Sequence, residues 1–300
     1  MKRIFTAVVL VLGLILSGYA QKNMELIPQE KSLIWEIKGK GLNQASFLYG
    51  TIHMIGKKDF FLTDGTKKSF DRAKQVAFEI DMEEMSDIMS LLPLLMQSFM
   101  KNDTTLQDLF SKEEYELVKD HFDKAGLPML FLNRIKPMFL SALDPSAMTG
   151  GDGGKKEDIV SYEMEFLEMA QSQKKPVEGL ETAAFQMSMF DSIPYRAQAQ
   201  MLLESIKSGS DASDTQFDQL VDLYKKQDIQ SMQTMMGEDD ATNNYNDLLL
   251  VNRNRKWIPV MEKMMQDKAT FFAVGAGHLG GAQGVIALLR AAGYTVEPVK

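Results

Sequence analysis

The chain has 300 residues, no cysteine, and 41 acidic against 33 basic side chains, which gives a formal net charge of −8. This acidic balance argues against nucleic-acid binding, which requires a basic surface for the phosphates, and the lack of cysteine excludes disulfides. A chain of this length can bury a sizeable core within one large domain.

The first twenty residues are typical of a secretory signal peptide. Lys2 and Arg3 precede the uncharged apolar residues 4–16, and small side chains then favour cleavage after Ala20. The apolar stretch is shorter than the roughly 20 residues that span a bilayer. An uncleaved N-terminal anchor, which would be the chain's contact with the membrane, is the alternative. We therefore expect a single mature domain over 21–300, in a bacterial periplasm or secreted, which a cysteine-free exported chain fits well.

In the first part of the chain, alternating apolar residues predict two strands that form a hairpin, followed by a helix and a third strand. In chain order, these elements are expected at residues 33–37, 45–49, 63–74 and 75–81. An apolar helix over 83–100 comes next, and Pro93 should kink or break it. A surface helix over 112–125 then ends at Gly126.

The middle of the chain is predicted to be helical around one short strand. Residues 148–156 are rich in glycine without a phosphate-binding signature, so we expect a linker or a lid there. Helices are expected over 158–172, 183–192, 195–208, 215–236 and 241–266, with a break near Pro259 and a strand at 175–181. The chain then ends in a strand, a glycine-rich turn, a helix and a last strand, at 269–274, 275–284, 285–292 and 294–299.

These patterns predict an α/β fold. A mixed sheet is built from the N- and C-terminal segments, and a large helical insertion occupies about 83–172 and 182–268. Short strand–turn–helix units favour parallel pairing in part of the sheet, whereas the first hairpin is antiparallel. Ligands of such sheets bind outside the carboxyl ends of the strands.

Two of the three histidines stand in the same four-residue frame. The frames Gly50-x-x-His53 and Gly275-x-x-His278 each follow an apolar, strand-like run, whereas His121 falls on a charged helix and is expected to be solvated. A glycine lets the chain turn sharply off a strand and lets the backbone approach a site closely. The repetition predicts one shared site for metal or acid–base chemistry, built from two halves.

Two carboxylates, Glu79 and Glu181, fall at or near the carboxyl ends of predicted strands. Imidazole and carboxylate together suit a first-row divalent cation, so we expect His53, His278 and Glu79 to bind a metal. Open coordination positions would allow a bound water to attack a carbonyl, and Glu79 could instead act as the general base. Glu181 either binds substrate or makes a cap-like contact with the helix that follows it.

Arg253 lies on an otherwise apolar predicted helix, within LLLVNRNRKW. Its guanidinium could clamp a substrate carboxylate or hold a ligand Glu in place, and a structural salt bridge is the alternative. The 22 methionines predict a Met-rich core, in which these flexible side chains fill irregular gaps. An apolar groove for a peptide or lipid is the alternative interpretation of these methionines.

Five segments of the chain resemble the TraB/GumN family, which includes the bacterial pheromone-shutdown proteins and the animal Tiki proteins. They are LYGTIHM with FEIDM, then VEGLET, then RNRKW, then FAVGAGHLGGAQGVIALLRAAGYTVEPV, and the resemblance extends over roughly 32–299. It implies a fold shared with erythromycin-esterase-like and haem-binding ChaN-like proteins. It also implies a metal-dependent peptidase activity with a preference for Mn or Co, as attributed to Tiki proteins.

Residue by residue, the resemblance matches both histidine frames and the acidic Glu79 between them. It also matches Arg253 and Asn254 to an Arg-Asn pair, so we place both, with Glu181, among the candidate substrate-binding residues. One hypothesis is an exported metal-dependent hydrolase that cleaves peptides or proteins with Mn or Co, Zn being an alternative. The second is a periplasmic protein that binds haem, a metal or a peptide without catalysis, and the third is an interaction protein. The physiological substrate and the oligomeric state stay open.

Overall fold

A six-stranded mixed sheet organises the chain, with the strand order β6-β4-β7-β2-β1-β8. The strands are β1 (Ile34–Lys38), β2 (Ser46–Thr51), β4 (Gln75–Ile80), β6 (Val177–Glu181), β7 (Thr270–Gly275) and β8 (Thr295–Pro298). The computed structural model describes residues 26–82, 88–143, 159–237 and 245–299, so the predicted signal peptide and the loop 148–156 lie outside it. The six predicted strands and the α/β fold class are confirmed.

Four neighbouring strands of this sheet are parallel. β4 pairs in parallel with β6 and β7, and β7 pairs in parallel with β2, whereas β1 pairs antiparallel with β2 and β8. The register sets Thr51 beside Gly275, and Ile80 beside Glu181. The carboxyl ends of the four parallel strands therefore meet at one edge of the sheet, as the sequence predicts.

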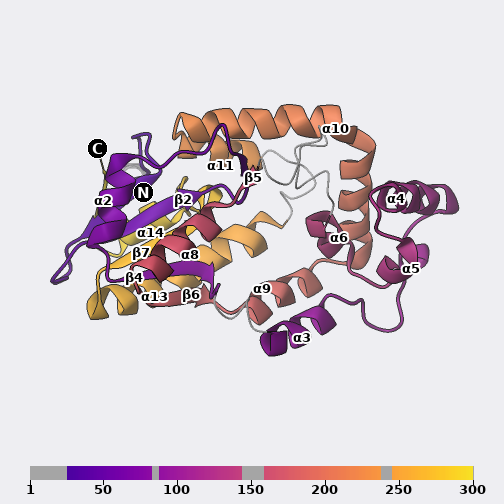
Figure 1. Ribbon diagram of the computed structural model, residues 1–300, viewed down its shortest axis with the longest axis horizontal. Helices are drawn as coiled ribbons and strands as arrows, with labels where there is room; N and C mark the ends of the chain where they lie inside the picture. Colours follow the sequence, from indigo (N-terminus) through magenta and orange to yellow (C-terminus); the bar gives the residue numbers. More distant parts are fainter. Residues whose placement is uncertain (1–25, 83–87, 144–158, 238–244, 300) are drawn as a thin grey trace, which may run out of the picture.

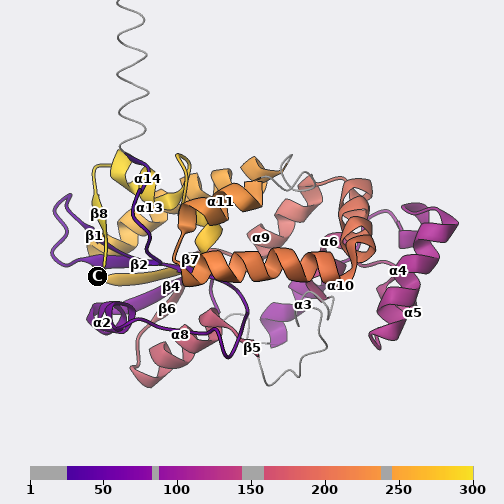
Figure 2. The same cartoon turned by 90° about the horizontal axis from the view of Figure 1, so that it is seen from above.

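Helices cover both faces of the sheet (Figures 1 and 2). α2 (Asp64–Arg72) and α8 (Tyr162–Ser172) pack on one face, and α13 (Asn252–Asp267) and α14 (Val285–Ala291) pack on the other. The core that these layers enclose is rich in aromatic side chains exposed by 1% or less, among them Trp35, Tyr49, Phe166, Trp257 and Phe271.

A second, smaller apolar cluster forms in the helical region that lies to one side of the sheet in Figure 2. The helices of this region are α3 (Ile88–Gln97), α4 (Lys112–Lys124), α5 (Met129–Leu132), α6 (Pro137–Leu143) and α9 (Ala183–Met189). The long helix α10 (Tyr195–Lys225) joins the two parts, since its Leu202 and Leu203 lie in the smaller cluster and its Tyr224 lies in the sheet core. Although α10 has 31 residues, neither it nor any other described helix is both long enough and apolar enough to cross a membrane.

The predicted break in α10 is wrong. The prediction separates helices at 195–208 and 215–236, but the structure continues the first helix to Lys225 and turns at Gln227, whose φ is 56°, before α11 (Ile229–Gly237). Glycine inside a helix costs about 1 kcal/mol. Apolar packing at both ends of α10 stabilises the helix by more than this cost, so the Gly-Ser segment does not end it.

Other element boundaries also differ from the prediction. α13 runs through Pro259, and α3 runs through Pro93, so neither proline ends its helix. The π-helical segment Asp247–Val251 leads directly into α13. Residues 159–160 form the short strand β5 (Ile159–Val160), which pairs antiparallel with β3 (Ile55–Gly56), where the prediction has a helix.

Candidate functional site

The four candidate residues at predicted strand ends gather at the carboxyl edge of the sheet. Glu79 is the next-to-last residue of β4, and Glu181 is the last residue of β6. His53 follows the end of β2 by two residues. His278 ends a short 3-10 turn, Ala276–His278, that continues directly from β7.

Both frames need glycine because other groups approach the backbone closely at these two positions. A Cβ atom on Gly50 would lie 3.1 Å from Ala276, a residue of the second frame. A Cβ atom on Gly275 would lie 3.3 Å from the Glu79 Oε1 atom and 3.6 Å from the His278 ring. The first glycine lets the two frames meet, and the second leaves room for the carboxylate.

His278 is buried, and Asn254 fixes the orientation of its ring. The His278 Nδ1 atom lies 2.6 Å from Asn254 Oδ1, while Asn254 Nδ2 faces the backbone carbonyls of His278 and Gln283. Because carbonyl oxygens only accept, the amide oxygen faces the ring, so Nδ1 carries the proton and Nε2 carries the lone pair. Burial lowers the pKa of His278 to about 4, so the ring is neutral at neutral pH.

Glu79 places a carboxylate beside this neutral imidazole. Its Oε1 atom lies 3.7 Å from His278 Nε2 and accepts a hydrogen bond of 2.8 Å from the Gly275 amide. Burial raises the pKa of Glu79, but His278, Arg253 and His53 outweigh this effect and hold the pKa well below its ordinary range. An ionised carboxylate next to an imidazole lone pair suits a first-row divalent cation.

Arg253 occupies the centre of the site. Its Nε and Nη2 atoms donate to Glu181 Oε1 at 2.9 and 2.6 Å, and Nη2 also donates to Glu79 Oε2 at 2.5 Å. Its Nη1 atom lies 3.2 Å from His278 Nε2, and its guanidinium stacks over Trp257 at 4.8 Å. In this structure Arg253 therefore makes the internal ion pairs that the sequence offers as the alternative to a substrate clamp.

Glu181 is held by the same internal network. Its side chain is 6% exposed, and its Oε2 atom accepts a hydrogen bond of 3.0 Å from Trp257 Nε1. Gln186 Nε2 lies 3.2 Å from Glu181 Oε1 and 3.3 Å from Glu79 Oε2. The cap of α9 is Thr182, so the predicted cap-like contact of Glu181 is not formed.

The substrate-binding roles of Glu181, Arg253 and Asn254 stay predictions. In the structure, Glu181 holds Arg253, and Asn254 holds the His278 ring. The sequence did not indicate Gln186 or Trp257 as part of the site, because an amide or an aromatic residue at a helical position carries no local signal of such a contact.

His53 forms the exposed side of the site. Its side chain is 74% exposed, and its Nδ1 atom lies 3.2 Å from Glu163 Oε1. The hydrogen bond to Glu163 raises the pKa of His53 to about 9, and Glu79, Arg253 and His278 are near enough to interact electrostatically with His53. Glu163 cannot be identified from the sequence, because an acidic residue in the first turn of a helix is common.

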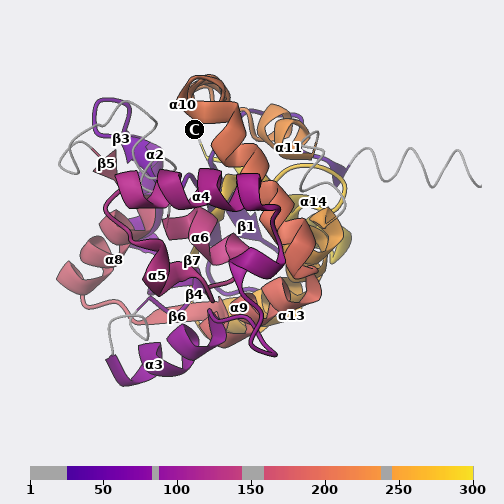
Figure 3. The same ribbon diagram turned by 90° about the vertical axis from the view of Figure 1, so that its right-hand side faces the viewer.

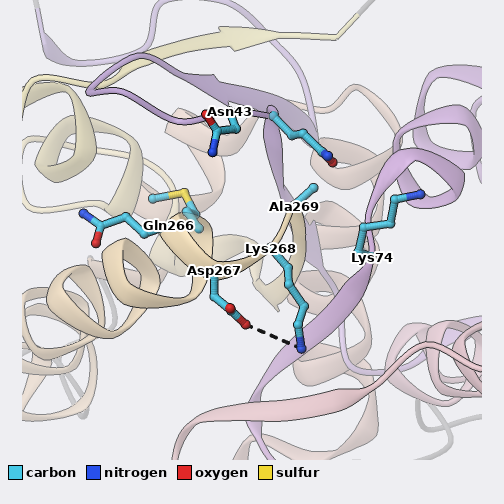
Figure 4. Close-up of a pocket in the computed structure, with 8 residues that line it drawn as sticks. Asn43, Lys74, Gln266, Asp267, Lys268 and Ala269 are labelled. Atoms are coloured by element: carbon cyan, nitrogen blue, oxygen red, sulfur yellow. Dashed lines mark ion pairs between the residues drawn. The ribbon is translucent and has the colours of Figure 1, made fainter.

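Other features lie away from this edge of the sheet. His121 is on α4, among the helices of the smaller apolar cluster (Figure 3). The pocket in Figure 4 is lined by Asn43, Lys74 and Lys268, among others, which precede strands β2, β4 and β7. That pocket therefore opens at the amino edge of these strands, opposite the candidate site.

The donor atoms at the site fit a divalent cation in their chemistry. His278 Nε2 and Glu79 Oε1 supply two adjacent donors, and His53 is the predicted third. Within the described residues, no three His, Cys, Asp or Glu side chains are already grouped closely enough to hold one ion. A cation at His278 Nε2 would replace the contact from Arg253 Nη1, while Arg253 could keep both hydrogen bonds to Glu181.

Both histidine frames lie within a region of the chain that matches a known protein family. The model for the TraB/PrgY/gumN family matches residues 33–298, nearly the whole described chain. The chain belongs to the TraB/PrgY/gumN family. No solved structure matches this member of the family significantly.

Three curated relatives of this TraB/PrgY/gumN protein are named metalloproteases. The chain is 25% identical to metalloprotease TIKI1 of Danio rerio, over 89% of this chain and 63% of that protein. It is 26% identical to metalloprotease TIKI1 of Homo sapiens, over 92% of this chain and 64% of that protein. It is 23% identical to metalloprotease TIKI2 of Xenopus tropicalis, over 89% of this chain and 59% of that protein. The chain thus spans about three-fifths of the length of these relatives.

Proposed function

We propose that this protein is an exported metal-dependent hydrolase that cleaves peptide bonds in peptides or proteins. His53, His278 and Glu79 would hold the divalent cation. The observation that carries the proposal is the pairing of a neutral imidazole, which keeps its lone pair on Nε2, with an ionised carboxylate whose Oε1 atom lies 3.7 Å from Nε2. The names of the curated relatives support the same class of reaction.

The bound cation would supply a Lewis acid for attack of water on the scissile carbonyl. The residues of the chain prepare the site for it. Asn254 keeps the proton on Nδ1 of His278, so the ring meets a cation through Nε2. Arg253 and the Gly275 amide keep Glu79 ionised, as a ligand or as a general base. The exposure of His53 leaves one side of the site open to a peptide.

Mn or Co is the proposed metal, with Zn as the alternative. We further propose that the signal peptide is cut after Ala20, and that the protein acts in the periplasm or after secretion. An acidic surface fits a protein or peptide substrate better than a nucleic acid.

Metal analysis and a peptide-library cleavage assay with added Mn²⁺ or Co²⁺ test the proposal together. The purified protein should retain metal and should cleave members of the library. His53→Ala should abolish both properties and leave the fold intact, since its side chain is 74% exposed. His278→Ala should abolish both as well, and circular dichroism would check its fold because that ring is buried.

The third histidine provides the matched control for these variants. His121→Ala removes an imidazole from α4, and it should keep both metal and cleavage. Full cleavage by His53→Ala would contradict the proposed ligand set.

Capture of haem or an apolar peptide without catalysis is the second candidate function. It is favoured by the apolar side chains exposed on α3, where Leu92, Leu95 and Met96 are 56%, 59% and 66% exposed. A Soret band after incubation with haem, together with no cleavage of the peptide library, would support this candidate over the hydrolase.

A further inference from the structure

We propose that Glu163 is the positioning residue of His53. Its carboxylate binds Nδ1 and leaves Nε2, on the other side of the ring, as the atom that a cation would bind in place of a proton. This inference rests on the proposed function for the identity of the ligand. The placement of the ring by Glu163 can be tested without any ligand.

A short two-stranded sheet brings these two residues together. Ile55 pairs with Val160, and Gly56 pairs with Ile159, in the antiparallel ladder of β3 and β5. His53 lies two residues before β3, and Glu163 lies three residues after β5. The ladder therefore attaches the segment after β2 to the start of α8, although about 110 residues of sequence separate the two side chains.

Two hydroxyl groups hold the Glu163 carboxylate in place independently of its contact with His53. Thr51 Oγ1 donates to Glu163 Oε1 at 2.7 Å, and Ser161 Oγ donates to Glu163 Oε2 at 3.0 Å. Thr51 is the last residue of β2 and is 2% exposed, and Ser161 is the cap of α8. The Glu163 side chain is itself only 15% exposed. A carboxylate held at both oxygens gives His53 one fixed partner.

The exposed position of His53 is the reason that a positioning residue is needed. A side chain that is 74% exposed meets little packing, and its ring would otherwise exchange among rotamers. The His278 ring has no such freedom, because it is buried and Asn254 binds its Nδ1 atom. Each histidine thus has an acceptor at Nδ1, which is the arrangement that commonly orients metal-binding imidazoles.

Removing the carboxylate should release the His53 ring in the metal-free protein. With ¹³C-labelled histidine, the chain gives three ring Cε1 signals, and their relaxation reports the order of each ring. In Glu163→Ala, the order of the His53 ring should fall towards that of a mobile side chain, while His278 stays unchanged as an internal reference. Glu163→Met keeps the side-chain volume without a carboxylate, so it should also lower the order of the His53 ring. It replaces Glu163→Ala as the test if that variant fails to fold.

The matched control is Glu168→Gln, which removes a charge from the exposed face of the same helix. It should change neither ring order nor metal binding. Calorimetric titration with Mn²⁺ should then show a dissociation constant raised about 10- to 100-fold by Glu163→Ala, the usual effect of losing a partner of a metal ligand.

Two results would overturn the positioning role of Glu163. One is an ordered His53 ring in both folded Glu163 variants, and the other is equal loss of order in Glu168→Gln. If the wild-type protein binds no Mn²⁺ and cleaves no peptide, the proposed function fails, yet the ring order in the metal-free variants still decides whether Glu163 positions His53.

Discussion

At the scale of single residues, the site depends on the guanidinium of Arg253, which contacts two carboxylates and an imidazole. Its side chain is 8% exposed, and those of Glu79 and Glu181 are 14% and 6% exposed. Burying two carboxylates is unfavourable unless their charges are paired. The same contacts that arrange the donor atoms therefore also determine whether this edge of the sheet is stable.

Arg253→Ala should lower the free energy of unfolding by about 3–5 kcal/mol, since it leaves two buried carboxylates without a cation. Urea unfolding would measure the loss. Arg255→Ala, on the exposed side of the same helix, removes a hydrogen bond of 2.9 Å to Gln283 and should cost less than about 0.5 kcal/mol. Adding Glu181→Gln to Arg253→Ala should recover part of the loss, because one uncompensated charge disappears. Equal losses in Arg253→Ala and Arg255→Ala would contradict this account.

A second ion pair, which joins the buried Lys136 to the partly exposed Asp191, predicts how stability depends on pH. Lys136 is 1% exposed, and its Nζ atom lies 2.5 Å from Asp191 Oδ1, while Lys101 Nζ lies 2.7 Å from Asp191 Oδ2. Burial raises the pKa of Asp191, but the hydrogen bonds from Lys101 and Lys136 outweigh it and lower the pKa below its ordinary value of 3.8. The folded state therefore binds this proton more weakly than the unfolded state does.

The stability that Asp191 contributes should be fully present above the unfolded pKa and lost as the pH falls through the lower folded pKa. Near neutral pH, Asp191→Asn should lower the free energy of unfolding by about 1–3 kcal/mol, less than for a fully buried pair. The difference in the free energy of unfolding between Asp191→Asn and wild type should shrink below pH 3.8. Urea unfolding over a pH series measures this difference, and Asp103→Asn, whose side chain is 93% exposed, should show no such trend.

At the scale of elements, Gly50 decides how closely β2 approaches the turn that follows β7. Gly50→Ala would place a Cβ atom 3.1 Å from Ala276, so strand or turn must shift. We expect a loss of about 1–3 kcal/mol in the free energy of unfolding, as for other overpacked interiors. Gly56→Ala is the control, because its nearest neighbour lies at 3.8 Å. Thermal unfolding that gives both variants the same midpoint would refute the close approach.

The same scale shows which parts of the fold can be predicted from sequence. Each main strand is an apolar run bounded by turn residues, so its position follows from local pattern, and the parallel edge then collects Glu79, Glu181 and His278. The ladder of β3 and β5 has two residues on each side, too few to show a periodicity. The pairing of His53 with Glu163, which follows from this ladder, therefore cannot be predicted from the sequence. The sequence predicts that Asn254 binds substrate, whereas its side chain binds the His278 ring. Sequence alone does not show which way a helical side chain points.

At the scale of the whole molecule, two apolar clusters share the helix α10. Leu203 packs in the smaller cluster, and Val221 and Tyr224 pack against the sheet. Tyr224 also donates a hydrogen bond of 3.0 Å to the carbonyl of Gly50, in the first histidine frame. The helix therefore connects the helical part of the chain to β2, the strand that leads into His53.

A cation that binds only the folded chain should stabilise the whole molecule by mass action. Mn²⁺ at 100 times its dissociation constant should add about 2.7 kcal/mol to the free energy of unfolding. For a domain of this size, that gain corresponds to a rise of about 5 °C in Tm, measurable by calorimetry with and without chelator. His278→Ala should lose the rise, because the buried imidazole donor is gone, whereas His121→Ala should keep it. An equal rise in His278→Ala would mean that Mn²⁺ binds elsewhere on this acidic chain.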